Sequence, residues 1–261
     1  MAERSYLNNS VDRALRVLEV FTEEQPLWSA AEVAAFLNTR YATLYPTLAT
    51  LEAHGYLQRD ELKRYRLGLK LVERSGQVLA GIDLRQVVRG HLRELAQQIG
   101  GNAHLAILYG NEVLYLLREV GQQAVVLSDI VGRRVPCHCT ALGKALLASL
   151  PEEELGERVS ALDFAPQTEN TITDPERLLQ EIAKVRRDGY ALEIEEFHLG
   201  SSCVGVVVRN HEAKAVAAIS VSMSASRLRD AGSEELIEAI RATADNIARE
   251  LGNHAASSDS A

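Results

Sequence analysis

The stretch SAAEVAAFLNTRYATLYPTLATLEAHGYLQRDELKRYRLG, residues 29–68, changes from a helical period to a strand-like one. It begins with Ser29 and, three positions later, Glu32, a capping-box pattern that predicts the start of a short helix. Leucines then recur at the spacing of one buried helix face, at Leu44, Leu48 and Leu51. Past Gly55, which is typical of a helix end, apolar and polar residues alternate on both sides of the charged turn 60–63. That alternation predicts a two-stranded hairpin.

A further helix is predicted before this stretch, where apolar residues recur at helical spacing and should be buried, at Val11, Leu15, Leu18 and Phe21. The short helix that Ser29 opens is expected to bury Val33, Phe36 and Leu37. Three helices followed by a hairpin predict a winged helix-turn-helix, whose third helix enters the major groove of DNA. Because Pro46 lies in the middle of this third helix, we expect the helix to start late or to kink.

The predicted third helix leaves an outer face for the DNA bases, made up of Arg40, Tyr41, Thr43, Tyr45 and Thr47. The hairpin supplies basic side chains that we expect at phosphates, Lys63, Arg64 and Arg66. Between Thr39 and Arg66, five basic residues outnumber three acidic ones, a small surplus of the kind that a nucleic-acid surface needs. A small helical domain that binds another protein would share this pattern apart from the exposed Arg, Tyr and Thr side chains, so both alternatives stay open.

The remainder of the chain predicts an α+β fold in which helices cover a mixed sheet. Strands are expected at 103–109, 112–118, 124–127, 190–193, 203–209 and 216–222, and helices at 69–81, 83–99, 140–150, 151–159, 173–188 and 233–251. We therefore divide the chain into a winged helix-turn-helix domain at 1–68, a linker helix at 69–82, a sensor-like domain at 83–252 and a disordered tail at 253–261.

The composition, with 46% hydrophobic and 25% charged residues, is that of a soluble globular protein. No run of about 18 apolar residues is present to span a bilayer, and the first residues lack the apolar core of a secretory signal. Three cysteines, Cys137, Cys139 and Cys203, cannot form a disulfide framework. These features predict a cytoplasmic protein with reduced thiols and no membrane partner. Residues 1–75 hold ten basic and ten acidic side chains, so the net charge of −8 falls on the rest of the chain.

Four blocks, in order along the chain, resemble the IclR family of bacterial transcriptional regulators: SVDRALRVL at 10–18, LATLEAHGYL at 48–57 with RYRLG at 64–68, GRRVPCHCTALGKA at 132–145, and VRRDGYA at 185–191. The resemblance implies a GAF-like domain that binds a small effector, joined by a linker helix to the winged helix-turn-helix. It also implies a homodimer or homotetramer on a short inverted repeat in double-stranded DNA. Control of a catabolic operon by a small organic or aromatic acid, through repression or activation, is the functional expectation. Most relatives carry a basic residue where this chain has Pro46, so the operator sequence cannot be transferred.

The resemblance places the effector pocket between the sheet and the helix at Gly143-Lys144. Ala141 and Leu142 would offer backbone N–H groups to a carboxylate at the start of that helix. Glu193 stands where the family usually has Asp, and the remaining pocket residues implied are Cys203, Ser220 and Ser222, with Leu127, Val135 and Ser201 in the wall. From the residues alone, the two serines of the strand at 216–222 could equally be satisfied core hydroxyls. Because a buried carboxylate opposes an acidic ligand, we expect Glu193 to accept a hydrogen bond from a ligand hydroxyl.

Two other functions fit parts of the sequence. The first is an enzyme, because cysteines and histidines can form a zinc site or supply a cysteine nucleophile. The candidates are Cys137, His138, Cys139, Cys203, His104, His198 and His211. The Cys-His-Cys run lacks the two-residue spacer of common structural zinc sites, and no hydrolase or phosphate-loop motif is present. We therefore expect no catalytic residue, no metal and no cofactor, and a regulator modulated by a metal stays open as an alternative ahead of a metal-dependent enzyme. The second alternative is a ligand sensor whose N-terminal domain binds a protein instead of DNA.

Overall fold

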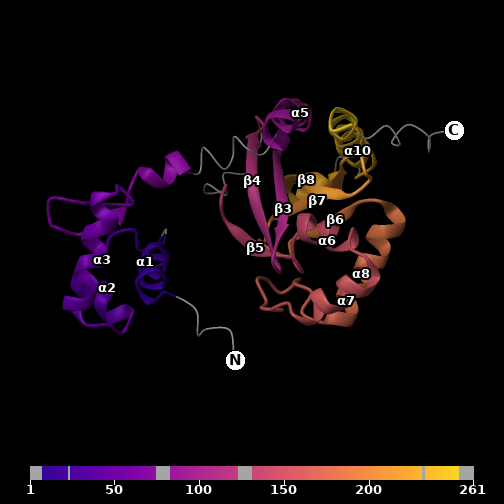
Figure 1. Ribbon diagram of the computed structural model, residues 1–261. Helices are drawn as coiled ribbons and strands as arrows, with labels where there is room; N and C mark the ends of the chain where they lie inside the picture. Colours follow the sequence, from indigo (N-terminus) through magenta and orange to yellow (C-terminus); the bar gives the residue numbers. More distant parts are fainter. Residues whose placement is uncertain (1–7, 23, 75–82, 123–130, 231–232, 253–261) are drawn as a thin grey trace. The chain divides into compact units, whose positions relative to one another are not determined.

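The computed structural model describes residues 8–22, 24–74, 83–122, 131–230 and 233–252. The chain divides into two compact units, one ending at Ile82 and the other beginning at Asp83, and each contains its own hydrophobic core (Figure 1). Within the described ranges, no helix is long and apolar enough to cross a membrane.

The N-terminal unit consists of three helices and a two-stranded hairpin. The helices are α1 (Asn9–Glu19), α2 (Ala30–Phe36) and α3 (Tyr41–Ala53), and the antiparallel strands are β1 (Leu57–Arg59) and β2 (Tyr65–Leu67). Residues 70–74 are helical, in the segment predicted as a linker, and the rest of that segment lies outside the described residues. The predicted order of three helices and a hairpin is confirmed.

Local signals set the boundaries of these helices. The capping box at the start of α2 is present, with the Glu32 backbone N–H donating to Ser29 Oγ over 3.2 Å and the Ser29 N–H donating to Glu32 Oε2 over 2.7 Å. Helix α3 buries Leu44, Leu48 and Leu51 as predicted. It begins at Tyr41, directly after the N-cap Arg40, so the expected late start is wrong. A proline at position 46 removes only the one hydrogen bond that its N–H would have donated, and the following turns of helix continue to Ala53.

Three residues of this unit that the sequence predicted to be buried are exposed. In α1 the core side chain is Val17, while Val11 and Leu15 are each 56% exposed. The helix has apolar residues on more than one side, and the side that carries Val17 packs into the core of the unit. In α2 the Phe36 side chain is 66% exposed, because its ring packs edge-on against Trp28 at the rim of the core instead of entering it.

The C-terminal unit is built on a six-stranded sheet with the order β5-β4-β3-β8-β7-β6. The strands are β3 (Asn102–Tyr109), β4 (Glu112–Val120), β5 (Arg134–Pro136), β6 (Ala191–Ile194), β7 (Ser201–Arg209) and β8 (Ala215–Ser224). Every pairing between them is antiparallel, so the expected mixed sheet is wrong, although the α+β class is confirmed. Neither β5 nor the short helix α9 (Ala225–Asp230) was predicted.

Helices cover both faces of this sheet (Figure 1). One face packs against α5 (Asp83–Ile99) and α10 (Ser233–Glu250), through side chains such as Leu105 and Ile219. The other face packs against α6 (Ala141–Ala148), α7 (Glu152–Ser160) and α8 (Pro175–Asp188). The strand predicted at 124–127 and the tail predicted at 253–261 lie outside the described residues. The face under α6 carries the polar residues of the candidate site.

Candidate effector-binding site

Strand register brings three predicted pocket residues into one row. Glu193 on β6 is paired with Cys203 on β7, and Cys203 is paired with Ser222 on β8. Directly paired residues of neighbouring strands project from the same face of a sheet, so these side chains share the face that α6 covers. Because the three residues come from separate strands, only the pairing of the sheet brings them together.

A small cavity of about 50 Å³ opens beside this row. Its walls are formed by His104, Tyr115, Arg133, Val135, Glu193, Phe197, His198, Ser201, Cys203 and Ser222. Five of the predicted effector-binding residues, Val135, Glu193, Ser201, Cys203 and Ser222, therefore lie on its walls. The others do not line it within the described part of the chain: Ala141, Leu142 and Ser220 are buried elsewhere, and Leu127 falls outside the described residues.

Close packing of α6 explains why Ser220 is kept from the cavity. Ser220 is paired with Gly205 on β7, and a Cβ added to Gly205 would come within 2.8 Å of the Ala141 backbone. The first turn of α6 therefore rests directly on the sheet at this point and covers the second serine of β8. The glycine at Gly143 is equally constrained, since a Cβ there would lie 2.3 Å from the Cys137 carbonyl oxygen.

Glu193 holds the segment that follows β6. Its Oε1 atom accepts hydrogen bonds from the backbone N–H groups of Glu196, at 2.7 Å, and Phe197, at 3.2 Å. Burial raises the pKa of this carboxyl group, and a hydrogen bond from the Cys203 thiol together with the backbone donors opposes that shift. Backbone donors of the protein therefore already bind this buried carboxyl group, and the expected hydrogen bond from a ligand hydroxyl stays a prediction. The second of these hydrogen bonds holds Phe197, a residue of the cavity wall, beside Glu193.

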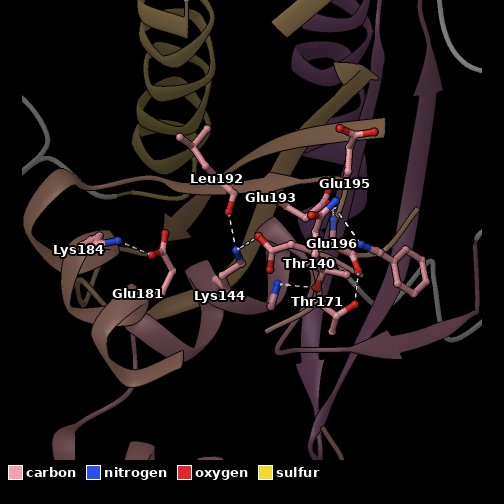
Figure 2. Close-up of polar contacts among 12 residues, drawn as sticks. Thr140, Lys144, Thr171, Glu181, Lys184, Leu192, Glu193, Glu195 and Glu196 are labelled. Carbon is pink, nitrogen blue, oxygen red and sulfur yellow. Dashed lines mark hydrogen bonds and ion pairs between the residues drawn. The ribbon is translucent and has the colours of Figure 1, made fainter. Parts of the chain in front are cut away.

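A buried ion pair ties the same segment to α6 (Figure 2). Lys144 Nζ lies 2.5 Å from Glu196 Oε1 and donates a second hydrogen bond, of 2.6 Å, to the Leu192 carbonyl oxygen. On the other side, the Thr171 hydroxyl donates to the Glu196 carbonyl oxygen over 2.7 Å. Burial raises the pKa of Glu196, and the Lys144 cation opposes that rise. Sequence reasoning did not assign a role to Lys144, although a lysine within the apolar run ALGKALLA is a signal of a buried partner.

His104 and Tyr115 are cavity residues that the predicted site does not contain. The His104 ring on β3 packs edge-on against the Tyr115 ring on β4, with centroids 5.4 Å apart and an interplanar angle of 83°. His104 is 2% exposed, and neither ring nitrogen has a hydrogen-bond partner in the described protein. Burial, with a smaller effect of the Arg118 cation, lowers the pKa of His104 to about 3. The imidazole is therefore neutral at physiological pH.

The predicted DNA-facing side chains of α3 are mostly accessible. Arg40, Tyr41, Thr43 and Tyr45 are exposed and Thr47 is half-buried, and the Tyr41 and Tyr45 rings stack with centroids 5.7 Å apart. A hydrogen bond with Tyr45 raises the pKa of the Arg59 guanidinium, so Tyr45 is also a link between α3 and the hairpin.

The basic side chains of the hairpin differ in their exposure and in their ion pairing. Lys63 and Arg66 are exposed. Arg64 is half-buried and bound to Asp60, with Nε 2.9 Å and Nη2 2.8 Å from Oδ2. Arg64 therefore already has a carboxylate partner within the hairpin, and its predicted contact with phosphate stays a prediction.

Comparison with known proteins identifies the family to which this chain belongs. Residues 10–61 match the model described as the IclR helix-turn-helix domain, and residues 76–249 match the model described as the bacterial transcriptional regulator IclR C-terminal domain. The chain belongs to the IclR family of transcriptional regulators. Among curated IclR-family proteins, it is 38% identical over 244 residues to the transcriptional regulator XynR of Escherichia coli, covering 93% of this chain and 97% of that one. It is 30% identical over 247 residues to KdgR of Dickeya chrysanthemi, covering 94% and 81%.

Solved IclR-family structures share the fold. The IclR protein of Thermotoga maritima aligns with a TM-score of 0.76 at 32% identity, covering 94% of this chain and 99% of that one. An IclR homologue from Microbacterium hydrocarbonoxydans, solved in complex with 4-hydroxybenzoate, aligns with a TM-score of 0.82 at 28% identity, covering 93% and 99%. The predicted resemblance to this family is confirmed.

The Cys-His-Cys run belongs to the packing of this IclR-family domain. Cys137 and Cys139 are buried, and burial raises the pKa of each thiol to about 12. His138 Nε2 lies 3.2 Å from the Ala165 carbonyl oxygen. A search of the described residues for three or more His, Cys, Asp or Glu side chains placed to hold a metal ion finds none. The candidate ligands His104, His198 and His211 are thus not gathered with the cysteines into such a group.

Proposed function

We propose that this IclR-family regulator binds operator DNA through its N-terminal unit and changes its operator affinity when a small organic acid occupies the cavity beside Glu193, Cys203 and Ser222. The observation that carries the proposal is the position of that cavity. It lies inside the unit that matches the IclR C-terminal model, and its walls combine buried polar side chains with an arginine, Arg133. Concave sites with a few converging polar groups are typical of small-molecule binding.

The proposed DNA contacts follow from the exposure of side chains on α3 and the hairpin. We assign base contacts to the outer face of α3, formed by Arg40, Tyr41, Thr43, Tyr45 and Thr47. We assign phosphate contacts to Lys63 and Arg66, with a smaller contribution from Arg64, whose charge Asp60 offsets.

The proposed route from effector to DNA begins in β3. His104 faces the cavity, and the next residue, Leu105, projects from the other face of the sheet into the core formed with α5. A ligand that shifts β3 therefore acts directly on α5, and we infer that α5 passes the change on to the segment 69–82 that precedes it. The ligand changes operator affinity only if it binds the DNA-competent and DNA-incompetent arrangements with different affinities.

The remaining parts of the proposal rest on the family. We infer a homodimer or homotetramer on a short inverted repeat, control of a catabolic operon, and action in the cytoplasm. The proposal gives the chain no catalytic residue, no metal and no cofactor. The Microbacterium homologue bound to 4-hydroxybenzoate supports an acid as the effector class.

The test is fluorescence anisotropy of the full chain on its own upstream intergenic DNA, at two salt concentrations, with and without a panel of small carboxylic acids. We expect saturable, sequence-specific binding that weakens steeply with salt, because phosphate contacts release counterions, and that one acid shifts. If the chain binds no DNA specifically in either condition, the DNA-binding proposal fails and a protein partner becomes the better explanation of the N-terminal unit.

A further inference from the structure

His104 is a buried polar side chain, 2% exposed, that lies among the described residues of the cavity wall. Neither Nδ1 nor Nε2 has a hydrogen-bond partner within the described protein, and the ring lines the effector cavity. Ser222 Oγ, on the same cavity wall, is also unpartnered among the described groups. A buried polar group left without a partner destabilises the folded state, whereas a phenylalanine in the same place would pack against Tyr115 without that loss. Two such groups on one cavity wall indicate that their partner comes from outside the chain.

The neutral imidazole sets a chemical requirement on that partner. It presents one N–H donor and one bare nitrogen that accepts. A carboxylate has only acceptor atoms, so it satisfies the N–H and leaves the bare nitrogen without a donor. A small acid satisfies both ring nitrogens by itself only if it also carries a donor group, for which a hydroxyl and an ammonium are the two common choices.

Charge selects the hydroxyl. Burial, and to a smaller extent the guanidinium of Arg118, which lies on β4 and is paired in register with His104, disfavour a positive charge on the imidazole. An ammonium at the same place would meet the same repulsion, while a hydroxyl carries no charge. Arg133 on the cavity wall favours an anion at the other end of the ligand.

We propose that His104 is a specificity-determining residue of the effector cavity and that the effector is a hydroxy acid, whose hydroxyl donates to the bare nitrogen of His104. This inference rests on the proposed effector function and names its ligand class. Ser222 supplies a second hydroxyl within the same wall, and the Glu193 carboxyl group remains bound to the backbone N–H groups of Glu196 and Phe197.

The experiment compares acids that differ by one hydroxyl group. The pairs are glycolate and acetate, lactate and propionate, and 4-hydroxybenzoate and benzoate, each titrated into the full chain by isothermal titration calorimetry. In the wild-type protein we expect the hydroxy member of at least one pair to bind about tenfold more tightly or better, because its deoxy partner leaves a buried acceptor unpaired. In His104→Phe that preference should collapse toward a ratio of one, and in His104→Gln, which keeps a donor and an acceptor, part of it should remain.

Several controls separate recognition from folding. His138→Gln alters another buried histidine that does not line the cavity, and it should keep the hydroxyl preference of the wild type. Circular dichroism verifies that each variant is folded. If His104→Phe does not fold, the same titrations are made with His104→Leu, and the proton uptake on binding is measured in the wild-type protein.

Three results would overturn the inference. The first is a hydroxyl preference that His104→Phe leaves unchanged. The second is equal binding of both members of every pair with uptake of about one proton, measured in two buffers of different ionisation enthalpy, which would make His104 an imidazolium that binds a simple carboxylate. The third is failure of all three hydroxy acids to bind. If another acid still shifts operator affinity in the anisotropy assay, the proposed function stands and only the hydroxy-acid inference fails; if no acid does, both fail.

Discussion

The Lys144 ammonium lies 2.5 Å from Glu196 Oε1, and this contact links α6 to the segment that leads into the cavity beside Glu193. Both side chains are buried, and Lys144 also donates to the Leu192 carbonyl oxygen. Glu196 in turn donates its backbone N–H to Glu193 on the cavity wall. The ion pair therefore connects the stability of the domain to the shape of the cavity.

Lys144→Met should destabilise the C-terminal unit by about 3–5 kcal/mol, because it leaves the Glu196 carboxylate buried without its cation. Urea unfolding of the full chain followed by far-ultraviolet circular dichroism measures the loss. The double variant Lys144→Met, Glu196→Leu should recover most of it, since it removes both charges. If the single variant is as stable as the wild type, the pair is not the link described above.

Acidification should destabilise the protein through His104. The unfolded histidine takes up a proton below its ordinary pKa of 6.5, while the folded one stays neutral down to a pKa of about 3. The contribution of the neutral His104 to the free energy of unfolding is therefore fully present above pH 6.5. It is lost as the pH falls below that value, by at most about 1.4 kcal/mol per pH unit.

Glu193 and Glu196 act with the opposite sign. Their raised pKa values keep protons on the folded protein above pH 4.5, so their contribution weakens as the pH rises. The difference between wild type and His104→Phe isolates the histidine. We expect the variant to be the more stable of the two, by a margin that grows between pH 6.5 and pH 5. A margin that does not vary with pH would show that His104 titrates normally in the folded protein.

Arg40→Ala should weaken operator binding more than Arg64→Ala. Arg40 is exposed at the start of α3, whereas the Arg64 guanidinium is bound to Asp60 and brings little net charge to DNA. Anisotropy titrations across a salt series give both affinity and salt slope. Loss of a phosphate contact lowers the magnitude of the slope of log affinity against log salt concentration by about one. Loss of a base contact weakens the binding free energy by about 1–3 kcal/mol and relaxes the sequence preference. Equal effects of the two substitutions would contradict the distinction drawn between these cations.

Pro46→Ala should stabilise the N-terminal unit. Alanine restores the helix hydrogen bond that proline cannot donate, a gain of about 3 kcal/mol in helix propensity, and the greater freedom of the unfolded chain offsets up to about 1 kcal/mol of it. Trp28 is the one tryptophan of the sequence and is buried in this unit, so its fluorescence reports the transition. The matched control is Pro26→Ala, outside any helix, which should give no comparable gain. A loss of stability in Pro46→Ala would show that the proline fits this helix better than alanine.

Much of the fold was predictable because its signals are local. The capping box of Ser29 and Glu32, the three leucines of α3 and the alternation in the hairpin each act within a few residues, and the structure contains all three elements. The α1 prediction failed at Leu15 because periodicity shows that a helix has an apolar side without showing which of two sides meets the core. The three-residue strand β5 was missed because no tight turn joins it to its partner β4, whereas a short charged turn marks the two strands of the hairpin.

The sequence by itself determined most of the helices and strands, the family and five of the residues on the cavity wall. Each of these depends on a local pattern or on motifs in order along the chain. Only the tertiary structure decided which polar groups meet. Lys144 and Glu196 are 52 positions apart, and His104 joins Cys203 and Ser222 only through pairing across β3, β8 and β7. Ser220 was excluded from the cavity because α6 rests on Gly205. Strand register and close backbone packing are properties of the assembled sheet, and no local period in the sequence encodes them.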